Sequence, residues 1–390
     1  MELRLIGAML LALSLGGTVD VAAGTPPFER AIWFVLVEDD DGTVVFERNS
    51  QLLAIPASVR KLFSAATIAE CLGPFSQVET ELWLDGEDVI IRGGGDPSFG
   101  SERYGYEPDT TFTPFIRALR DRGVRRVRDV IADVSMFDGV TIPYQWKVGN
   151  LTSDYAAPVE ALAFRENEIR DGAVPSPPLF AAAEFREALT RAGITVGGSI
   201  RTNVVPRVWQ QRVAVIRSPF VQQLLTTVLK NSHNMYAETL YKRTAAGREK
   251  PASYERAREL EAATLVEAGL EASEFRFVDG SGLAPDDLVT AAGVVKMLRW
   301  MNAPARRSLY WDVLAQPAGE GTLRTRLVTL TDTMRGKTGT VAGVNSIAGI
   351  ITNASGRSRY FVVMINHHTG TSAAASRLLD AIVEAAAEGF

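Results

Sequence analysis

The sequence contains very little cysteine and histidine. Cys71 is the only cysteine, so no disulfide bond can form within the chain. It lies in an apolar helical pattern, and we expect it to be buried as a packing residue. The histidines are His233, His367 and His368. Because the last two are neighbours at the end of a predicted strand, their side chains would point to opposite faces, which leaves little material for a metal site.

The chain also lacks a strong charge of either sign. It has 41 Lys and Arg against 46 Asp and Glu, a formal net charge of -5. The nearest approach to a run of like charge is a group of arginines that Asp121 and Asp129 interrupt and that contains no aromatic side chains: Arg120, Arg122, Arg125, Arg126 and Arg128. Such a group is typical of a solvated surface, and we expect no nucleic acid partner.

The apolar run at residues 5–17 is shorter than the ~20 residues that a membrane-spanning helix needs. Arg4 precedes it, and Val21 and Ala23 occupy the −3 and −1 positions of a cleavage site after Ala23. This layout predicts a signal peptide at residues 1–23, with a retained membrane anchor as the alternative. We therefore expect a periplasmic or secreted protein without a transmembrane anchor after cleavage.

The two ends of the chain have similar patterns. Residues 28–37 and 43–47 predict a β-hairpin, and residues 333–353 and 359–366 predict a second hairpin around a turn at 354–356. Amphipathic helices follow both, the first after Pro56 and the last at 372–389. We expect the two hairpins to share one antiparallel sheet with helices on both faces.

Residues 74–213 differ from these ends. They combine short strands, the glycine-rich stretch at 93–100 and a helix at 181–194, which indicates a mixed α/β insert. The predicted organisation is a discontinuous domain at 24–73 and 214–390, interrupted by an inserted domain at 74–213.

Ser58 and Lys61 open the helix that follows Pro56. Because residues three apart on a helix lie on one face, the hydroxyl and the amine would be neighbours. A serine hydroxyl is a weak nucleophile that needs a nearby base. Lysine can be that base if burial or a second cation lowers its pKa from the usual ~10.4. On its own, the pair is better explained by a helix-capping serine and a surface lysine.

Ser232, His233 and Asn234 precede a further predicted helix. The Ser232 hydroxyl could relay a proton from the base to a leaving amine, and the Asn234 amide could donate to the peptide carbonyl of a substrate. Alone, these residues would be read as a helix-capping cluster.

Lys337, Thr338, Gly339 and Thr340 open a predicted strand. The lysine supplies a positive charge for a carboxylate, and the glycine lets a ligand backbone approach closely. The backbone amides of Thr340 and Ser58 could point at a developing oxyanion, where such donors contribute about 2.7–4 kcal/mol each. Alone, this segment fits the polar start of an edge strand.

Together these three motifs, SxxK, SxN and KTG, occur once each, in the order and local contexts typical of serine β-lactamases and penicillin-binding proteins. The chain most closely resembles the low-molecular-mass class C penicillin-binding proteins, the D-alanyl-D-alanine carboxypeptidase/endopeptidases. The resemblance extends over nearly the whole mature chain and rests on six ordered segments: 56–66, 93–99, 231–240, 279–283, 318–327 and 336–344.

The resemblance implies an α+β fold: a penicillin-binding, serine β-lactamase-like transpeptidase domain with an inserted α/β domain. By position, Ser58 would be the acylated nucleophile, Lys61 its general base, and Ser232 a proton relay with Lys337 as its partner. Asn234 would hold the substrate amide.

The third motif would complete the implied site, with Thr338 and Thr340 binding the substrate carboxylate beside Gly339. The implied reaction partners are peptidoglycan stem peptides, with β-lactam antibiotics as covalent inhibitors. No metal or organic cofactor is implied, and the oligomeric state is left open.

Two features depart from the family's pattern. His233 stands where the family usually has aspartate, and we expect its side chain to point away from the substrate. The stretch from residue 161 to 178 is too short for the small third domain often nested there, so we expect a form without that domain.

Two other readings stay open. The first is a β-lactamase or serine esterase on the same fold, for which Glu160, Glu166 and Glu168 are candidates to direct the deacylating water. The second is a wall-binding homologue without turnover. Within the preferred reading, the sequence leaves open whether the terminal D-Ala or a cross-link is the bond cut.

Overall fold

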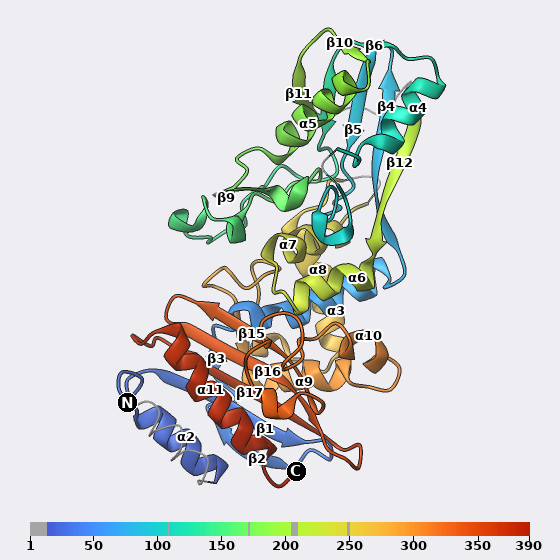
Figure 1. Cartoon of the computed structure of the whole chain (residues 1–390). Coiled ribbons are helices and arrows are strands. Elements are labelled where there is room, and N and C mark those ends of the chain that lie inside the picture. The colour runs from blue at the N-terminus through green and yellow to red at the C-terminus, as the bar shows by residue number, and fades with distance from the viewer. Residues whose placement is uncertain (1–13, 108, 171, 204–209, 248–249) are drawn as a thin grey trace. The chain divides into compact units, whose positions relative to one another are not determined.

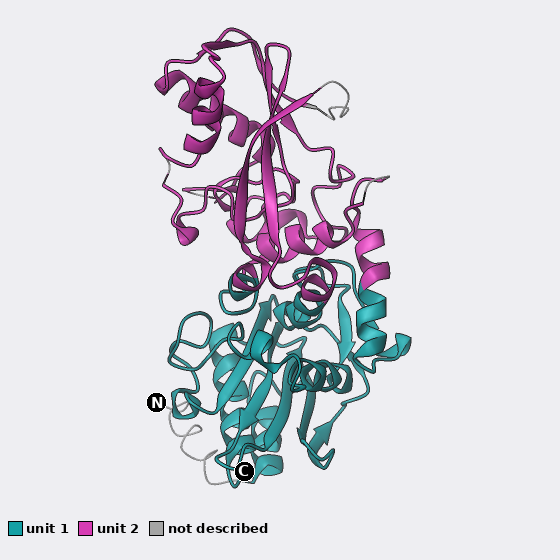
Figure 2. Ribbon diagram, turned by 90° about the vertical axis from the view of Figure 1, so that its right-hand side faces the viewer, with its two compact units in different colours: residues 1–66, 225–232, 261–390 teal, residues 67–224, 233–260 magenta. Residues whose placement is uncertain are grey.

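The computed structural model describes residues 14–107, 109–170, 172–203, 210–247 and 250–390. The chain divides into two compact units (Figure 2). The first unit comprises residues 1–66, 225–232 and 261–390, and the second comprises 67–224 and 233–260. The domain boundaries expected after residue 73 and before residue 214 stay a prediction.

The first unit is built on a five-stranded antiparallel sheet in the order β15-β16-β17-β1-β2 (Figure 1). Its strands are β1 Ile32–Asp39, β2 Val44–Arg48, β15 Met334–Val341, β16 Val344–Thr352 and β17 Ser358–Asn366. Strands from both ends of the chain pair directly, with Val35 opposite Val363. The prediction that the two ends share one antiparallel sheet is confirmed.

One detail of that prediction is wrong. Residues 333–353 were expected to form a single arm of a hairpin, but they form β15 and β16, which are joined by a tight turn. Gly343 in this turn has φ +75°, a conformation that glycine adopts without steric cost. The C-terminal segment therefore contributes three strands instead of two.

Helices cover both faces of this sheet. On one face, Trp33, Val35 and Val37 share a core with α11 (Ser372–Ala387). On the other face, α9 (Ala291–Met301) is tied to the sheet by Arg299 Nε, which donates to Glu38 Oε1 at 2.7 Å. Because successive side chains along a strand point to opposite faces, the sheet packs against one helical layer on each face.

Helix α2 (Leu15–Gly24) packs into the same core as α11. Val19 and Ala22 of this helix are fully buried. Residues 1–13 of the predicted signal peptide lie outside the described residues, whereas its last residues form α2. No helix in the described part of the chain has the length and apolar character needed to cross a membrane.

The second unit contains a mixed five-stranded sheet in the order β11-β7-β5-β4-β12. Its strands are β4 Gln77–Asp85, β5 Asp88–Arg92, β7 Val130–Asp133, β11 Ile200–Asn203 and β12 Gln211–Phe220. Helices α4 (Thr113–Asp121) and α5 (Pro177–Arg191) pack on it through a buried cluster of phenylalanines: Phe99, Phe112, Phe115, Phe164 and Phe185. This is the mixed α/β architecture that the sequence predicted.

Further elements lie close to the candidate site residues in the sequence. Those that lie wholly or partly in the first unit are β3 Leu53–Ala54, η1 Ala57–Arg60, α3 Lys61–Leu72, α6 Val221–Leu229, β13 Phe275–Arg276 and β14 Leu288–Thr290. Those that lie wholly or partly in the second unit are η2 Glu102–Tyr104, η4 Asp154–Ala156, η5 Arg165–Asn167, β8 Glu168–Ile169, α7 Asn234–Thr244 and α8 Tyr254–Glu267.

Cys71 does not have the predicted burial. It is exposed in the last turn of α3, next to the exposed Glu70 and beyond the buried run that ends at Ala69. The helix stops at Gly73, where φ is +81°. The apolar pattern was extended one turn too far, which explains the error.

Candidate active site

Ser58 and Lys61 meet because the chain enters α3 through a short 3₁₀ helix, η1. In a 3₁₀ helix, residues three apart lie directly above one another. Lys61 Nζ donates to Ser58 Oγ at 2.8 Å and to the carbonyl of Ser281 at 2.7 Å. Lys61 is fully buried, whereas Ser58 is partly accessible. The structure therefore joins a partly accessible hydroxyl to a buried amine through a hydrogen bond.

The turn that presents the Ser281 carbonyl is organised by a buried carboxylate. Asp279 Oδ1 accepts from the amides of Ser281 (3.0 Å) and Gly282 (2.7 Å), and its Oδ2 accepts from Ala284 at 2.8 Å. Gly282 has φ +81°, and a Cβ there would lie 2.0 Å from the Ala57 carbonyl oxygen. Only glycine lets this turn approach the nucleophile segment so closely.

Asp287 completes this buried arrangement. Burial, together with the neighbouring Asp279 charge, raises the pKa of Asp287 well above its usual value. Two adjacent buried carboxyls do not both ionise readily, so the neutral form of Asp287 is favoured beside Asp279. The sequence identified this stretch, 279–283, only by resemblance and assigned it no role. The Ser281 carbonyl is thus a contact that sequence reasoning missed, although the Asp-Gly-Ser-Gly turn was a visible signal.

A second ammonium–hydroxyl pair joins Lys337 and Ser232. Lys337 Nζ donates to Ser232 Oγ at 2.7 Å and to the Thr338 carbonyl at 2.6 Å. Ser232 has φ +61°, which is unfavourable for a residue with a side chain. Burial and the positive charge of Lys61 hold the pKa of Lys337 well below its usual range. The two lysines are therefore electrostatically coupled within one site.

Strand β15 brings the third motif against the first. A Cβ at Gly339 would lie 2.8 Å from the Ser58 backbone nitrogen and 2.8 Å from the Pro56 carbonyl oxygen. Ser346 on β16 holds the segment before Ser58 against the sheet, since its Oγ donates to the Pro56 carbonyl at 2.6 Å. The close approach explains why glycine, which lacks a Cβ, stands at position 339.

The remaining residues of the third motif have separate environments. Thr338 Oγ1 donates to Thr322 Oγ1 at 2.8 Å, which ties the strand to the segment 318–327. Thr340 is exposed, and its Oγ1 accepts from Asn345 Nδ2 at 3.3 Å. The structure thus gathers Ser58, Lys61, Ser232 and the residues 337–340 within the first unit.

A buried ion pair fixes the start of α3. Arg60 donates through both terminal nitrogens to Glu261, at 2.6 and 2.8 Å, and its guanidinium lies 3.9 Å from the Phe277 ring centroid. Both side chains of the ion pair are almost completely buried. A two-point contact of this kind restricts rotation of the helix that carries Lys61.

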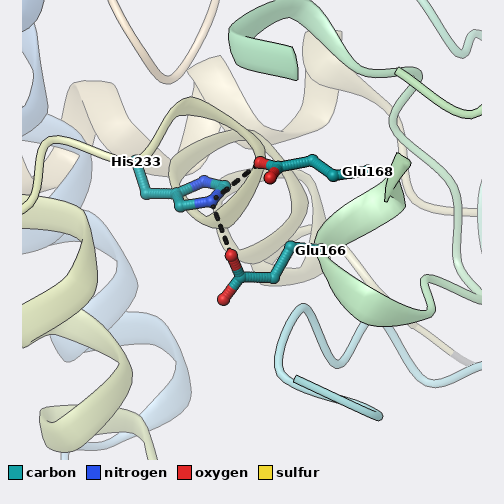
Figure 3. Close-up of side chains that lie close together, drawn as sticks. All are labelled: Glu166, Glu168 and His233. Atoms are coloured by element: carbon teal, nitrogen blue, oxygen red, sulfur yellow. Dashed lines mark hydrogen bonds and ion pairs between the residues drawn. The ribbon is translucent and has the colours of Figure 1, made fainter. Parts of the chain in front are cut away.

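Asn234 and His233 belong to the second unit. Asn234 opens α7, and its Nδ2 donates to the Tyr155 carbonyl at 2.8 Å. His233 precedes it, with Nε2 3.2 Å from Glu166 Oε2 and 3.4 Å from Glu168 Oε1 (Figure 3). The side chain of His233 therefore faces two carboxylates, a contact that the sequence did not predict.

Among the described residues, Glu166, Glu168 and His233 are also the one group of three potential metal ligands. The second oxygen of Glu166 is already occupied. It accepts from Ser101 Oγ (2.6 Å), Arg103 Nε (3.1 Å) and Tyr236 OH (3.0 Å). A cation is thus already present beside this carboxylate.

The geometry of the first unit suits acyl transfer. A hydroxyl hydrogen-bonded to a buried amine is the arrangement of an activated serine nucleophile. A family model for the D-Ala-D-Ala carboxypeptidase 3 (S13) family matches residues 15–176 and 171–388. The chain belongs to this family. The family membership predicted from the three motifs is confirmed.

Related proteins agree with this assignment. Carboxypeptidase DacB of Mycolicibacterium smegmatis is 26% identical over 372 residues, which cover 89% of this chain and 79% of the relative. A D-alanyl-D-alanine carboxypeptidase of an Actinomadura species is 24% identical over 445 residues, covering 90% and 81%.

Among solved structures, penicillin-binding protein 4 (DacB) of Haemophilus influenzae matches with a TM-score of 0.83 at 20% identity, over 94% of this chain and 98% of that one. A second structure of the Haemophilus protein is a complex with a β-lactam. The predicted fold class is therefore confirmed.

Proposed function

We propose that this protein is a serine D-alanyl-D-alanine carboxypeptidase/endopeptidase that acts on peptidoglycan stem peptides through an acyl-enzyme on Ser58. The observation that carries the proposal is the 2.8 Å hydrogen bond between buried Lys61 and Ser58, in a chain of the S13 family. The family supports the substrate class, and the geometry supports the choice of nucleophile.

Acylation begins when the neutral amine of Lys61 takes the Ser58 proton. The Ser58 oxygen attacks the penultimate D-Ala carbonyl, and the backbone amides of Ser58 and Thr340 donate to the oxyanion. The peptide C–N bond then breaks. The leaving amine takes a proton through the Ser232 hydroxyl, and terminal D-Ala departs.

The substrate is held by the surrounding polar groups. Thr338 and Thr340 bind its carboxylate, and Gly339 lets its backbone lie close to β15. Lys337 orients the Ser232 hydroxyl through their 2.7 Å hydrogen bond. Asn234 donates to the substrate amide.

In the second step, Lys61 takes a proton from a water molecule, whose oxygen attacks the ester carbonyl. The ester C–O bond to Ser58 then breaks, and Lys61 returns that proton to the Ser58 oxygen. A β-lactam would acylate Ser58 by the same attack, with its ring amide as the leaving group. Because that group stays attached, it obstructs the incoming water and prolongs the covalent state.

The substrate lies outside the cytoplasm, so we also propose that the protein is exported by an N-terminal signal peptide to the periplasm or beyond. A cut after Ala23 would remove Val19 and Ala22 from the core of the first unit. N-terminal sequencing of the exported protein tests the position of the cut.

The test of the reaction is release of D-Ala from a D-Ala-D-Ala peptide by wild type and Ser58→Ala. We expect no release by the variant and no covalent labelling by a fluorescent penicillin. Release at the wild-type rate would disprove the assignment. Equal deacylation of penicillin and peptide would favour a β-lactamase, and absence of labelling in wild type would favour a non-catalytic homologue.

A further inference from the structure

The second motif of this chain departs from the family's pattern at one residue. His233 lies between Ser232 and Asn234, where the resemblance to the family predicts aspartate. A substitution of an acid by a base reverses the charge that the neighbouring residues must accommodate. The residues around His233 show how this chain accommodates it.

Two carboxylates face the imidazole of His233 from the segment 166–168 (Figure 3). The segment takes an uncommon path, because Arg165, Glu166 and Asn167 all have positive φ, between 49° and 59°. Such a backbone is unfavourable by roughly 1–3 kcal/mol per residue and persists only where its surroundings hold it.

Asn167 provides much of that support. Its side-chain oxygen accepts from the Phe164 amide at 3.0 Å, and its nitrogen donates to the Pro158 carbonyl at 3.0 Å. Asn167 is fully buried. The two carboxylates are therefore presented to His233 by a locked turn and not by a loose loop.

The charges around His233 are nearly balanced when the imidazole is protonated. Glu166 and Glu168 face it directly, Tyr236 packs edge-on against its ring at 4.8 Å, and Arg103 lies behind Glu166. Burial alone would lower the pKa of His233, but hydrogen bonds to the two carboxylates and their charges outweigh it and raise the pKa.

Glu166 shows the complementary effect. Burial alone would raise its pKa, but the hydrogen bond and charge of His233, with Ser101 and Arg103, lower it far below its usual range. Both shifts favour a protonated imidazole beside an ionised carboxylate, whereas a carboxylate at position 233 would place a third negative charge among these groups.

We propose that His233 is a positioning residue. Glu166 and Glu168 both hold its Nε2, a contact that we call the clamp, and the clamp fixes the start of α7 and thereby the amide of Asn234 for the substrate. The proposal rests on the proposed function, because Asn234 acts on the substrate only in that reaction.

The first arm of the test exchanges charges in the full chain. His233→Asp should lower kcat/KM for D-Ala release about a hundredfold, because three carboxylates then repel one another and displace Asn234. Glu166→Gln with Glu168→Gln in the same background should recover most of that loss. His233→Gln, which keeps one neutral donor, should lose about tenfold.

The second arm is the pH profile of kcat/KM. The clamp is complete below the pKa of His233 and is lost as pH rises through it. Glu168→Gln removes one carboxylate, so this fall should move to lower pH, while the folded state persists because Glu168 is partly exposed. His367→Gln and Glu187→Gln, two exposed residues outside the clamp, should leave the profile unchanged.

Three results would overturn the clamp. The first is a His233→Asp variant as active as wild type, and the second is a Glu168→Gln profile identical to that of wild type. The third is one equivalent of zinc in the purified chain that disappears in His233→Gln, since the imidazole would then be a metal ligand. If wild type itself neither releases D-Ala nor binds fluorescent penicillin, the proposed function fails instead.

Discussion

Two lysines, one in each unit, are fully buried but have different partners. Lys242 of the second unit contacts Asp138 at 2.7 Å and lies near the rings of Phe137 and Tyr254. Lys337 of the first unit bonds a hydroxyl and a carbonyl, and no described carboxylate lies within 4.0 Å of its ammonium.

Equal burial therefore leads to different consequences. A carboxylate partner offsets part of the cost of burying a cation, and loss of either partner destabilises the structure. A buried cation beside a second cation is easily deprotonated and suits proton transfer. The difference between the partners, and not burial itself, distinguishes the proposed catalytic Lys337 from Lys242.

The largest expected effect is on activity. Lys337→Met should lower kcat/KM for D-Ala release about 10²–10⁴-fold, because the Ser232 hydroxyl loses the group that orients it. Lys242→Met should stay within a few-fold of wild type. Steady-state kinetics on a D-Ala-D-Ala peptide measure both, and similar losses in the two variants would remove the distinction between these lysines.

The next largest effect is on stability, where Lys242→Met should be the more damaging of the two variants. Lys242→Met leaves Asp138 without its partner and should lower the free energy of unfolding by about 1–3 kcal/mol. Lys337→Met replaces an unfavourably buried cation and should lower the free energy of unfolding by less than Lys242→Met does. Chemical denaturation monitored by circular dichroism compares them, and a larger loss for Lys337→Met would contradict this account.

The pH dependence of stability sharpens the comparison. Burial lowers the pKa of both lysines, and that of Lys337 falls further because Lys61 lies near it while Asp138 opposes the shift in Lys242. Between the lowered pKa and the unfolded value of ~10.4, the unfolded chain holds more protons.

Stability should therefore rise with pH across that interval, by at most about 1.4 kcal/mol per pH unit for each lysine. Relative to wild type, Lys337→Met should remove more of this rise between pH 7 and 10 than Lys242→Met does. Denaturation curves at several pH values measure the slopes, and equal slopes would show that the two burials are equivalent.

The smallest effect is expected at Asp287. Burial and the neighbouring Asp279 raise its pKa well above the usual value, which favours its neutral form. Asp287→Asn should change the free energy of unfolding by about 1 kcal/mol or less and leave acylation of Ser58 unchanged. Asp279→Asn, which weakens an acceptor of three backbone amides, serves as the contrasting variant. A loss above about 3 kcal/mol in Asp287→Asn would show that this group is ionised.

Much of the first unit was predictable from the sequence. The alternating apolar pattern at both ends of the chain predicted the strands of the shared sheet. The helix predicted after Pro56 placed Ser58 and Lys61 on one face, because residues three apart on a helix are neighbours. The turn at Gly343 was missed because apolar residues continue through it, so that two strands resembled one.

The contacts made by distant residues were not predictable in this way. The Ser281 carbonyl reaches Lys61 from 220 positions along the chain, and nothing local to residue 281 indicates its target. His233 was expected only to point away from the substrate. One of its carboxylate partners, Glu166, lies in the 165–167 turn, and the other, Glu168, follows that turn at the start of β8. The positive φ values of the turn occur at residues other than glycine and leave no compositional signal.

The pairing of β1 with β17 has a consequence for how the protein is made. Strand β17 begins more than 300 residues after β1, so the central pair of the sheet cannot form until almost the whole chain has been synthesised. Contacts of such sequence separation slow folding. The sheet of the first unit is therefore completed only late in translation, and β1 lacks its β17 partner until then.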